Sequence, residues 1–174
     1  MTHTDPLSVF SGCHVGIIRQ IKKLAEIPDR IKAKDGSAAK LAAELRAFFN
    51  DVIVKHHRDE EETLFVATRE VLDQHLSEAF MLSGYIGRLT EEHRHLERLW
   101  GRVEPELKKL EKGKTEALSD NIIKQLSIDY LAHAQFEEDV FLPLSEKILS
   151  QHDKAGLGMM MHMRDVESDV RAYL

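Results

Sequence analysis

Four long stretches of the chain contain few helix-breaking residues and carry large apolar residues at steps of three and four positions. One turn of an α-helix takes about 3.6 residues, so these steps line the apolar side chains up on one face of a helix. We therefore expect helices over residues 6–27, 38–74, 77–112 and 119–150. No segment alternates apolar and polar residues as a β-strand does.

Short connections should bring these helices together. Pro28 is expected to end the first helix, and the run EKGKTEALSD is expected to hold the turn before the fourth. Four amphipathic helices joined in this way predict an all-α fold, an up-down-up-down four-helix bundle. We expect one domain over residues 1–174, with the bundle at about 6–151 and an additional short C-terminal helix at about 153–174.

Composition restricts the partners and the compartment. The formal net charge of -6 and the sequence pI of about 5.9 give no electrostatic case for nucleic acid. No apolar run is long enough to predict a membrane span, and the first ten residues lack a secretory signal. The single cysteine, Cys13, excludes an internal disulfide and fits a reducing compartment, so we expect a cytoplasmic protein.

Ten histidines are many for a chain of 174 residues, and one falls on the apolar stripe of each expected helix. Three of these four histidines are followed, four residues on, by a glutamate. At about 1.5 Å of rise per residue, the four histidines reach roughly the same level of the bundle. The candidate ligands that result are His14, His56, Glu60, His93, Glu97, His133 and Glu137.

Each of these signals is weak when taken alone. A lone histidine in a core is more often a hydrogen-bonded core residue than a ligand, and His-x-x-x-Glu is common on solvent-exposed faces. Four imidazoles and three carboxylates buried at one level would, however, lack cationic partners, and burying them so is costly. A metal site removes that cost. The nitrogen and oxygen donors suit iron, and zinc or manganese as substitutes, better than calcium.

The remaining histidines are expected to lie elsewhere. His57 on the inner face would bring a charged series with it, so His56 is the preferred ligand. His95 lies among arginines on a wet face. The other histidines, expected at termini, at turns or on the C-terminal helix, are His3, His75, His152 and His162.

The sequence also contains an internal repeat. Aligning His56 with His133 places HHRDEEETLFV over HAQFEEDVFLP, so that Glu60 matches Glu137. His14 precedes His56 by 42 residues and His93 precedes His133 by 40. The chain therefore reads as two helical hairpins, each of which supplies two histidine-bearing helices.

This set of residues resembles the hemerythrin-like family, also called the HHE cation-binding domain. The resemblance rests on His14 and on the pairs His56 with Glu60, His93 with Glu97 and His133 with Glu137. It implies a four-helix bundle around a non-heme di-iron centre, with Glu60 and Glu137 bridging two iron ions and the others as terminal ligands. Respiratory members carry a histidine where this chain has Glu97.

The functional expectation follows from that resemblance and from the donor set. We expect a non-heme di-iron protein that binds or reacts with a small gaseous ligand or peroxide, as a redox protein or a sensor of oxygen, peroxide or nitric oxide. Two alternatives stay open: reversible oxygen binding or storage, and a metal-stabilised structural or interaction module. Whether the protein is an enzyme is left open.

Overall fold

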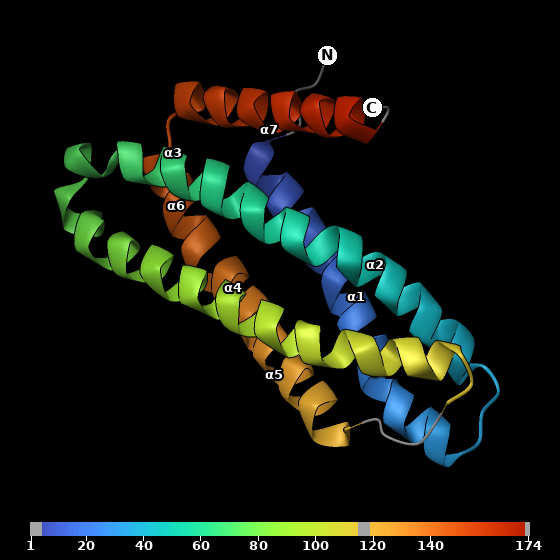
Figure 1. Ribbon diagram of the computed structural model, residues 1–174. Helices are drawn as coiled ribbons and strands as arrows, with labels where there is room; N and C mark the ends of the chain where they lie inside the picture. Colours follow the sequence, from blue (N-terminus) through green and yellow to red (C-terminus); the bar gives the residue numbers. More distant parts are fainter. Residues whose placement is uncertain (1–4, 115–118, 173–174) are drawn as a thin grey trace.

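The computed structural model describes residues 5–114 and 119–172, with side chains described as far as His162. Every regular element of these residues is helical, and no strand occurs among them (Figure 1). The long helices are α1 (Pro6–Lys32), α2 (Ala38–Asp59), α4 (Leu76–Glu111), α5 (Asp120–Phe136) and α7 (Gln151–Ala172). The short elements are η1 (Glu60–Leu64), α3 (Phe65–Glu70), η2 (Leu72–Gln74), η3 (Glu137–Phe141) and α6 (Leu142–Ile148).

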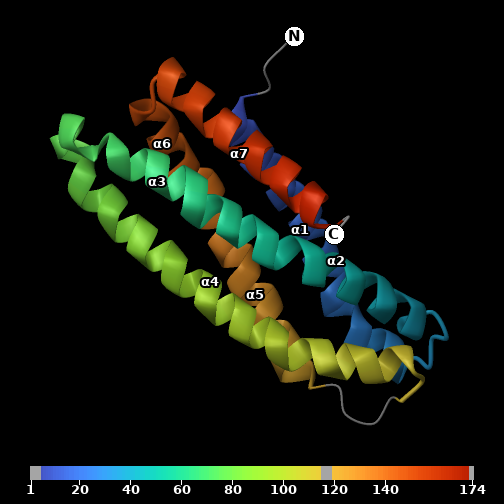
Figure 2. The same ribbon diagram turned by 45° about the horizontal axis from the view of Figure 1, so that its top comes forward.

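Four of the long helices pack in a ring. The first, α1, contacts α2 and α5, and α4 contacts the same two helices from the other side. The last long helix, α7, lies outside this ring, where it contacts α1 and η1 (Figure 2). None of the helices in the described residues is long and apolar enough to cross a membrane.

The apolar stripes bury two separate hydrophobic clusters, one toward each end of the bundle. The bundle has four helical rods: α1, α2 with η1 and α3, α4, and α5 with η3 and α6. Each rod passes from one cluster to the other at a histidine. The buried residues on either side of that histidine are Phe10 and Ile17, Ile53 and Leu64, Leu89 and Leu96, and Tyr130 and Phe141. The four histidines, predicted from the sequence to lie at one level, therefore lie between the two hydrophobic clusters.

Several boundaries differ from those expected. The first helix does not end before Pro28 but continues to Lys32, with the proline ring buried inside the bundle. Proline removes only one backbone hydrogen bond, and packing of the buried ring offsets that loss. The C-terminal helix begins at Gln151, two residues before the expected start, and its 22 residues make it as long as α2.

The second and fourth rods are also not single α-helices. Each is interrupted by a five-residue π-helical turn, η1 in the second rod and η3 in the fourth. These two turns begin at Glu60 and Glu137, the two matched glutamates of the sequence repeat. Such turns hold one extra residue and occur frequently at functional sites.

Candidate metal centre

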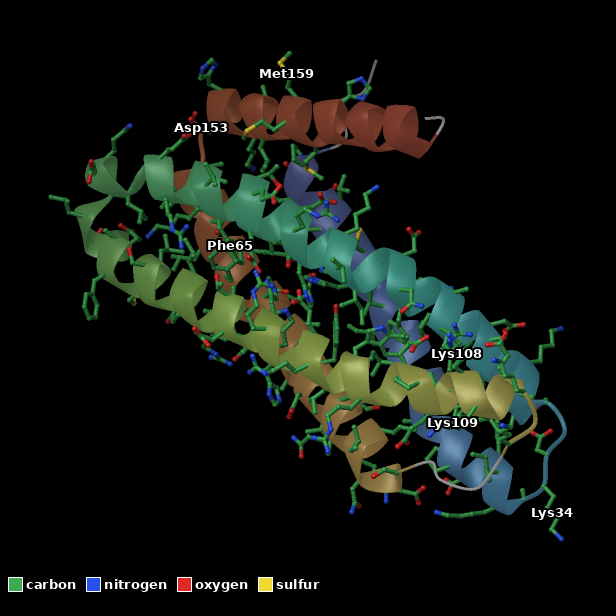
Figure 3. The ribbon with its side chains drawn as sticks, in the orientation of Figure 1. Lys34, Phe65, Lys108, Lys109, Asp153 and Met159 are labelled. Atoms are coloured by element: carbon green, nitrogen blue, oxygen red, sulfur yellow. The ribbon has the colours of Figure 1, made fainter. Side chains whose placement is uncertain are left out.

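Six of the seven predicted ligands come together at the level between the two apolar clusters. Their donor atoms form two groups, each within 4.8 Å, that share two glutamates. One group contains His14, His56, Glu60 and Glu137, and the other contains Glu60, His93, His133 and Glu137. Phe65, labelled in Figure 3, stacks on His93 at 5.9 Å between ring centroids and marks this level of the bundle.

Glu60 stands between the two pairs of histidines. Its Oε1 atom lies 3.5 Å from the Nε2 atom of His14 and 3.3 Å from that of His56. Its Oε2 atom lies 3.2 Å from the Nε2 atom of His93. One carboxylate therefore faces imidazoles from three different helices.

Glu137 faces histidines of α1, α4 and α5. Its Oε2 atom lies 2.9 Å from the Nε2 atom of His14 and 3.3 Å from that of His133. Its Oε1 atom lies 4.0 Å from the Nε2 atom of His93. Both glutamates are 1% exposed, so neither carboxylate is hydrated by bulk water.

These inward-facing atoms have no hydrogen-bond partner. Of twelve such buried side-chain atoms in the described residues, eight belong to this site, namely the Nε2 atoms of the four histidines and all four oxygens of Glu60 and Glu137. Native proteins rarely leave even single buried polar groups unsatisfied. Eight nitrogen and oxygen donors aimed at one another fit metal ions of the iron, manganese and zinc type, so the site could hold a metal.

Carboxylates also hold the Nδ1 side of three of the four histidine rings. The Nδ1 atom of His14 lies 2.5 Å from Glu138, that of His93 lies 2.8 Å from Glu61, and that of His133 lies 2.9 Å from Glu92. An Nδ1–H group that donates to a carboxylate leaves the Nε2 lone pair free for a metal. The hydrogen bonds therefore select the tautomer that a ligand requires.

Two matched pairs of consecutive glutamates supply both the carboxylates that face the centre and carboxylates that hold the Nδ1 side of a histidine. Glu60 and Glu137 point into the centre, whereas the next residues, Glu61 and Glu138, hold histidines of a neighbouring helix. Both doublets lie at the start of a π-helical turn. The sequence repeat is thus a repeat of structure around the centre.

Burial and charge together shift the ionisation of the site in the metal-free protein. Burial, followed by the charge of Glu137, raises the pKa of Glu60 to about 8. Burial opposes the charge on His14, but the nearby carboxylates of Glu137 and Glu60 outweigh it and raise its pKa to about 11. Burial lowers the pKa of His56 and of His93, so these two rings are neutral.

The seventh predicted ligand, Glu97, lies apart from these groups. Its Oε1 atom is 3.1 Å from the Nδ1 atom of His57, and both of its oxygens accept hydrogen bonds from Arg94. The hydrogen bond with His57 is the main reason that the pKa of Glu97 is lowered. Glu97 therefore belongs to a second polar cluster beside the centre.

The expectation that His57 lies away from the centre is wrong. Its side chain is 0% exposed and stacks on His93 with 4.0 Å between ring centroids. Its Nε2 atom is 3.3 Å from the hydroxyl oxygen of the buried Tyr130. The reason is that α2 packs against both α1 and α4, so two of its faces are covered.

A sequence signal for His57 was present. Phe49 and Ile53 precede it by eight and four residues, and both are fully buried. The charged residue that seemed to exclude this face, Arg46, reaches outward to Glu104 and Glu111 on α4. A long arginine side chain can lie over an apolar stripe while its charge stays at the surface.

A surface cavity of about 300 Å³ reaches one ligand of the centre. It lies against His56 and has Cys13 and Met161 in its wall. The apolar side chains of Val9, Phe10 and Val52 also line it, and Lys55, Asp51 and Asp59 supply charged groups. A molecule the size of peroxide or a diatomic gas fits this volume readily.

The other histidines lie outside the centre. His95 pairs with Asp129 at 2.8 Å on the surface, and His162 is exposed on α7. His3 lies outside the described residues. Cys13 is exposed and does not join the ligand groups.

Comparison with known proteins agrees with this geometry. The family model described as the hemerythrin HHE cation binding domain matches residues 5–145, which span all six converging ligands. A search of curated proteins returned no match. The matched segment covers most of the sequence, and the chain therefore belongs to the hemerythrin HHE cation-binding family.

Proposed function

We propose that this protein holds two iron ions in a non-heme centre and binds or reacts with a small ligand there, with oxygen, peroxide and nitric oxide as the candidates. The observation that carries the proposal is the set of eight buried donor atoms without hydrogen-bond partners. We take the four helical rods to have the up-down-up-down order expected of the family, and the cytoplasm to be the compartment.

The ligands divide between two ions. His14 and His56 would hold one ion, and His93 and His133 the other, with Glu60 and Glu137 between them. Carboxylates bridge two metals where neutral imidazoles do not, and their two negative charges offset part of the charge of the ions. Iron held in this way supplies the one-electron and oxygen chemistry that protein side chains lack.

The chain itself contributes orientation and exclusion of water. Glu61, Glu92 and Glu138 hold three imidazoles in the ligand tautomer. The two apolar clusters close the centre along the bundle axis. The cavity beside His56 gives a small molecule an approach to one ion. Its size disfavours a bulky organic substrate.

The decisive experiment combines metal analysis with an optical spectrum. Protein prepared with iron should contain close to two irons per chain. The reduced protein should change its spectrum on exposure to air, and should either return to the reduced form under vacuum, as a reversible oxygen carrier does, or remain oxidised, as a redox protein does. One metal per chain, or a spectrum unaffected by oxygen, peroxide and nitric oxide, would refute the proposal.

A metal-stabilised structural module remains the second candidate, because six buried ligands also suit zinc. The two candidates differ in the metal-free state. The apolar clusters should keep the redox protein helical without metal, whereas a structural site contributes to folding outright. Circular dichroism of chelator-treated protein separates them.

A further inference from the structure

The outer nitrogen of His56 lacks the partner that the other three candidate ligand histidines have. The Nδ1 atoms of His14, His93 and His133 each lie against a glutamate. No described side chain or backbone group is hydrogen-bonded to Nδ1 of His56, although that residue is only 4% exposed. A histidine that binds metal through Nε2 almost always donates its other N–H to a carboxylate, a backbone carbonyl or water. His56 therefore has a donor for which residues 5–114 and 119–162 supply no acceptor.

The internal repeat identifies the acceptor that is missing. Glu92 on α4 holds His133 on α5, and the corresponding residues are Cys13 on α1 and His56 on α2. The helices are paired in the same way, because α1 packs on α2 as α4 packs on α5. A cysteine side chain is shorter than that of a glutamate and carries no carboxylate. A space therefore remains where a fourth outer carboxylate would lie.

The cavity of about 300 Å³ lies at this position, with both Cys13 and His56 in its wall. The Nε2 atom of His56 faces Glu60 at 3.3 Å, and the two ring nitrogens point in nearly opposite directions, so Nδ1 lies on the cavity side. At the roughly 30 Å³ that a water molecule takes in the liquid, the volume holds a ligand of up to about ten non-hydrogen atoms. Apolar side chains such as Phe10 and Val52 suit a hydrocarbon tail.

The charge around the cavity favours an anion once the metal ions are bound. In the wall, Asp51 and Asp59 carry one negative charge more than Lys55 balances. Two divalent ions behind His56 exceed the charge of the two carboxylates that they share by two units, and bound cations are often the largest local charges in a site. The expected occupant is therefore anionic, as Glu92 is at the corresponding place.

We propose that this cavity binds a small organic monocarboxylate, whose oxygen accepts the Nδ1–H of His56 and whose apolar tail lies against Phe10 and Val52. The ligand supplies for His56 what Glu92 supplies for His133. Loss of such a partner costs roughly 10- to 100-fold in metal affinity, so binding of the ligand should raise metal affinity by a similar factor. Linkage requires the metal to raise the affinity for the ligand equally. This inference rests on the two-ion centre proposed above, through the ion at His56.

Titration of the zinc-loaded protein with butyrate tests the site. Zinc is diamagnetic, so nuclear magnetic resonance of ¹⁵N-labelled histidine can follow each Nδ1–H group. Butyrate should shift the Nδ1–H resonance of His56 and leave those of His93 and His133 unchanged. Butyramide has the same shape without the charge and should bind about tenfold more weakly. Competition with a chelator should show that saturating butyrate raises zinc affinity by about tenfold or more.

Two variants of Cys13 test the missing carboxylate itself. Cys13→Glu places a carboxylate of the chain where that of the ligand would lie. It should raise zinc affinity by roughly 10- to 100-fold without butyrate, shift the Nδ1–H resonance of His56 and abolish the effect of butyrate. Cys13→Gln is the matched control, which fills the same volume without the charge. It should also lose butyrate binding, but should gain less zinc affinity than Cys13→Glu.

The outcomes separate this inference from the function on which it rests. Fewer than two zinc ions in the unaltered chain would overturn the two-ion centre and this inference with it. Two bound ions with a His56 resonance that butyrate leaves unshifted would overturn the carboxylate site alone and leave water as the acceptor. A butyrate-dependent shift of the Nε2 resonance of His14 would also overturn it, because the carboxylate would then bind the ion itself. Equal binding of butyramide would overturn the assignment to a carboxylate.

Discussion

The two helical hairpins supply the centre almost symmetrically, but their surroundings differ. His14 corresponds to His93, Glu60 to Glu137 and Glu61 to Glu138, and each member has the same kind of contact as its counterpart. The residues of the second polar cluster have apolar counterparts: Ala134 for His57, Ile18 for Glu97 and Ile53 for Tyr130. The polar cluster is therefore an addition to one side of a symmetric centre.

The opposite side has a different feature. Glu92, which holds His133, corresponds to Cys13, and Cys13 lies in the wall of the cavity that reaches His56. His93 and His133 are thus both held by carboxylates and packed beside the imidazole of His57, whereas His56 of the other pair lies beside a space open to small molecules. The candidate ligands are therefore repeated in both hairpins, whereas the residues around them are not.

The largest effect should come from Glu60 and Glu137, the two carboxylates that both ligand groups share. Glu60→Ala and Glu137→Ala should each weaken binding of both ions by more than the roughly 100-fold that loss of an outer-shell partner can cost. Helix content should stay unchanged, because the apolar clusters are intact. Metal analysis and circular dichroism measure the two quantities, with exposed Glu70→Ala as the control.

A loss of only one ion in either variant would contradict a shared bridge. It would instead assign Glu60 and Glu137 to separate ions.

Glu61 and Glu138, whose carboxylates bond to Nδ1 atoms of the histidines, should also have equal effects on metal affinity, but smaller ones. Glu61→Gln and Glu138→Gln each keep the shape of the side chain but weaken the hold on the Nδ1–H of His93 or His14. Each should lower metal affinity by roughly 10- to 100-fold, and by similar amounts. Competition with a chelator measures the affinities, and exposed Glu91→Gln is the matched control. A large effect in one hairpin alone would break the symmetry.

The pH dependence of metal binding follows from the pKa values of the metal-free site. Below pH of about 8 Glu60 holds a proton, and below about 11 His14 does, so a metal must displace both at pH 7. Affinity should therefore rise with pH, by about tenfold per unit for each proton displaced, and the slope should fall above pH of about 8. Calorimetry in two buffers of different ionisation enthalpy counts the protons. Binding without proton release would contradict these ionisation states.

The smallest effect should come from the cavity. Val52→Phe narrows the space beside His56 without touching a ligand. It should slow association of nitric oxide with the reduced iron protein several-fold while leaving the metal content unchanged. Stopped-flow absorbance measures the rate, and the exposed neighbour Val54→Phe is the control. An unchanged rate would mean that small ligands reach the ions by another path.

Much of the candidate centre could be predicted from the sequence. Steps of three and four residues place His14, His56, His93 and His133 on apolar stripes, and the rise per residue places them at one level. The sequence repeat matched Glu60 with Glu137, and the family resemblance implied that these two glutamates share the centre. These inferences hold because they depend on the geometry of a single helix, which the sequence alone determines.

Only the tertiary structure decided the roles of His57 and Glu97. Periodicity gives the direction of a side chain about its own helix axis, but the neighbouring helices decide which directions are covered. Because α2 is covered by both α1 and α4, two adjacent histidines can both be buried, and Glu97 meets His57 instead of the centre. The π-helical turns and the continuation of α1 through Pro28 likewise depend on packing, which outweighs the local preference of the chain.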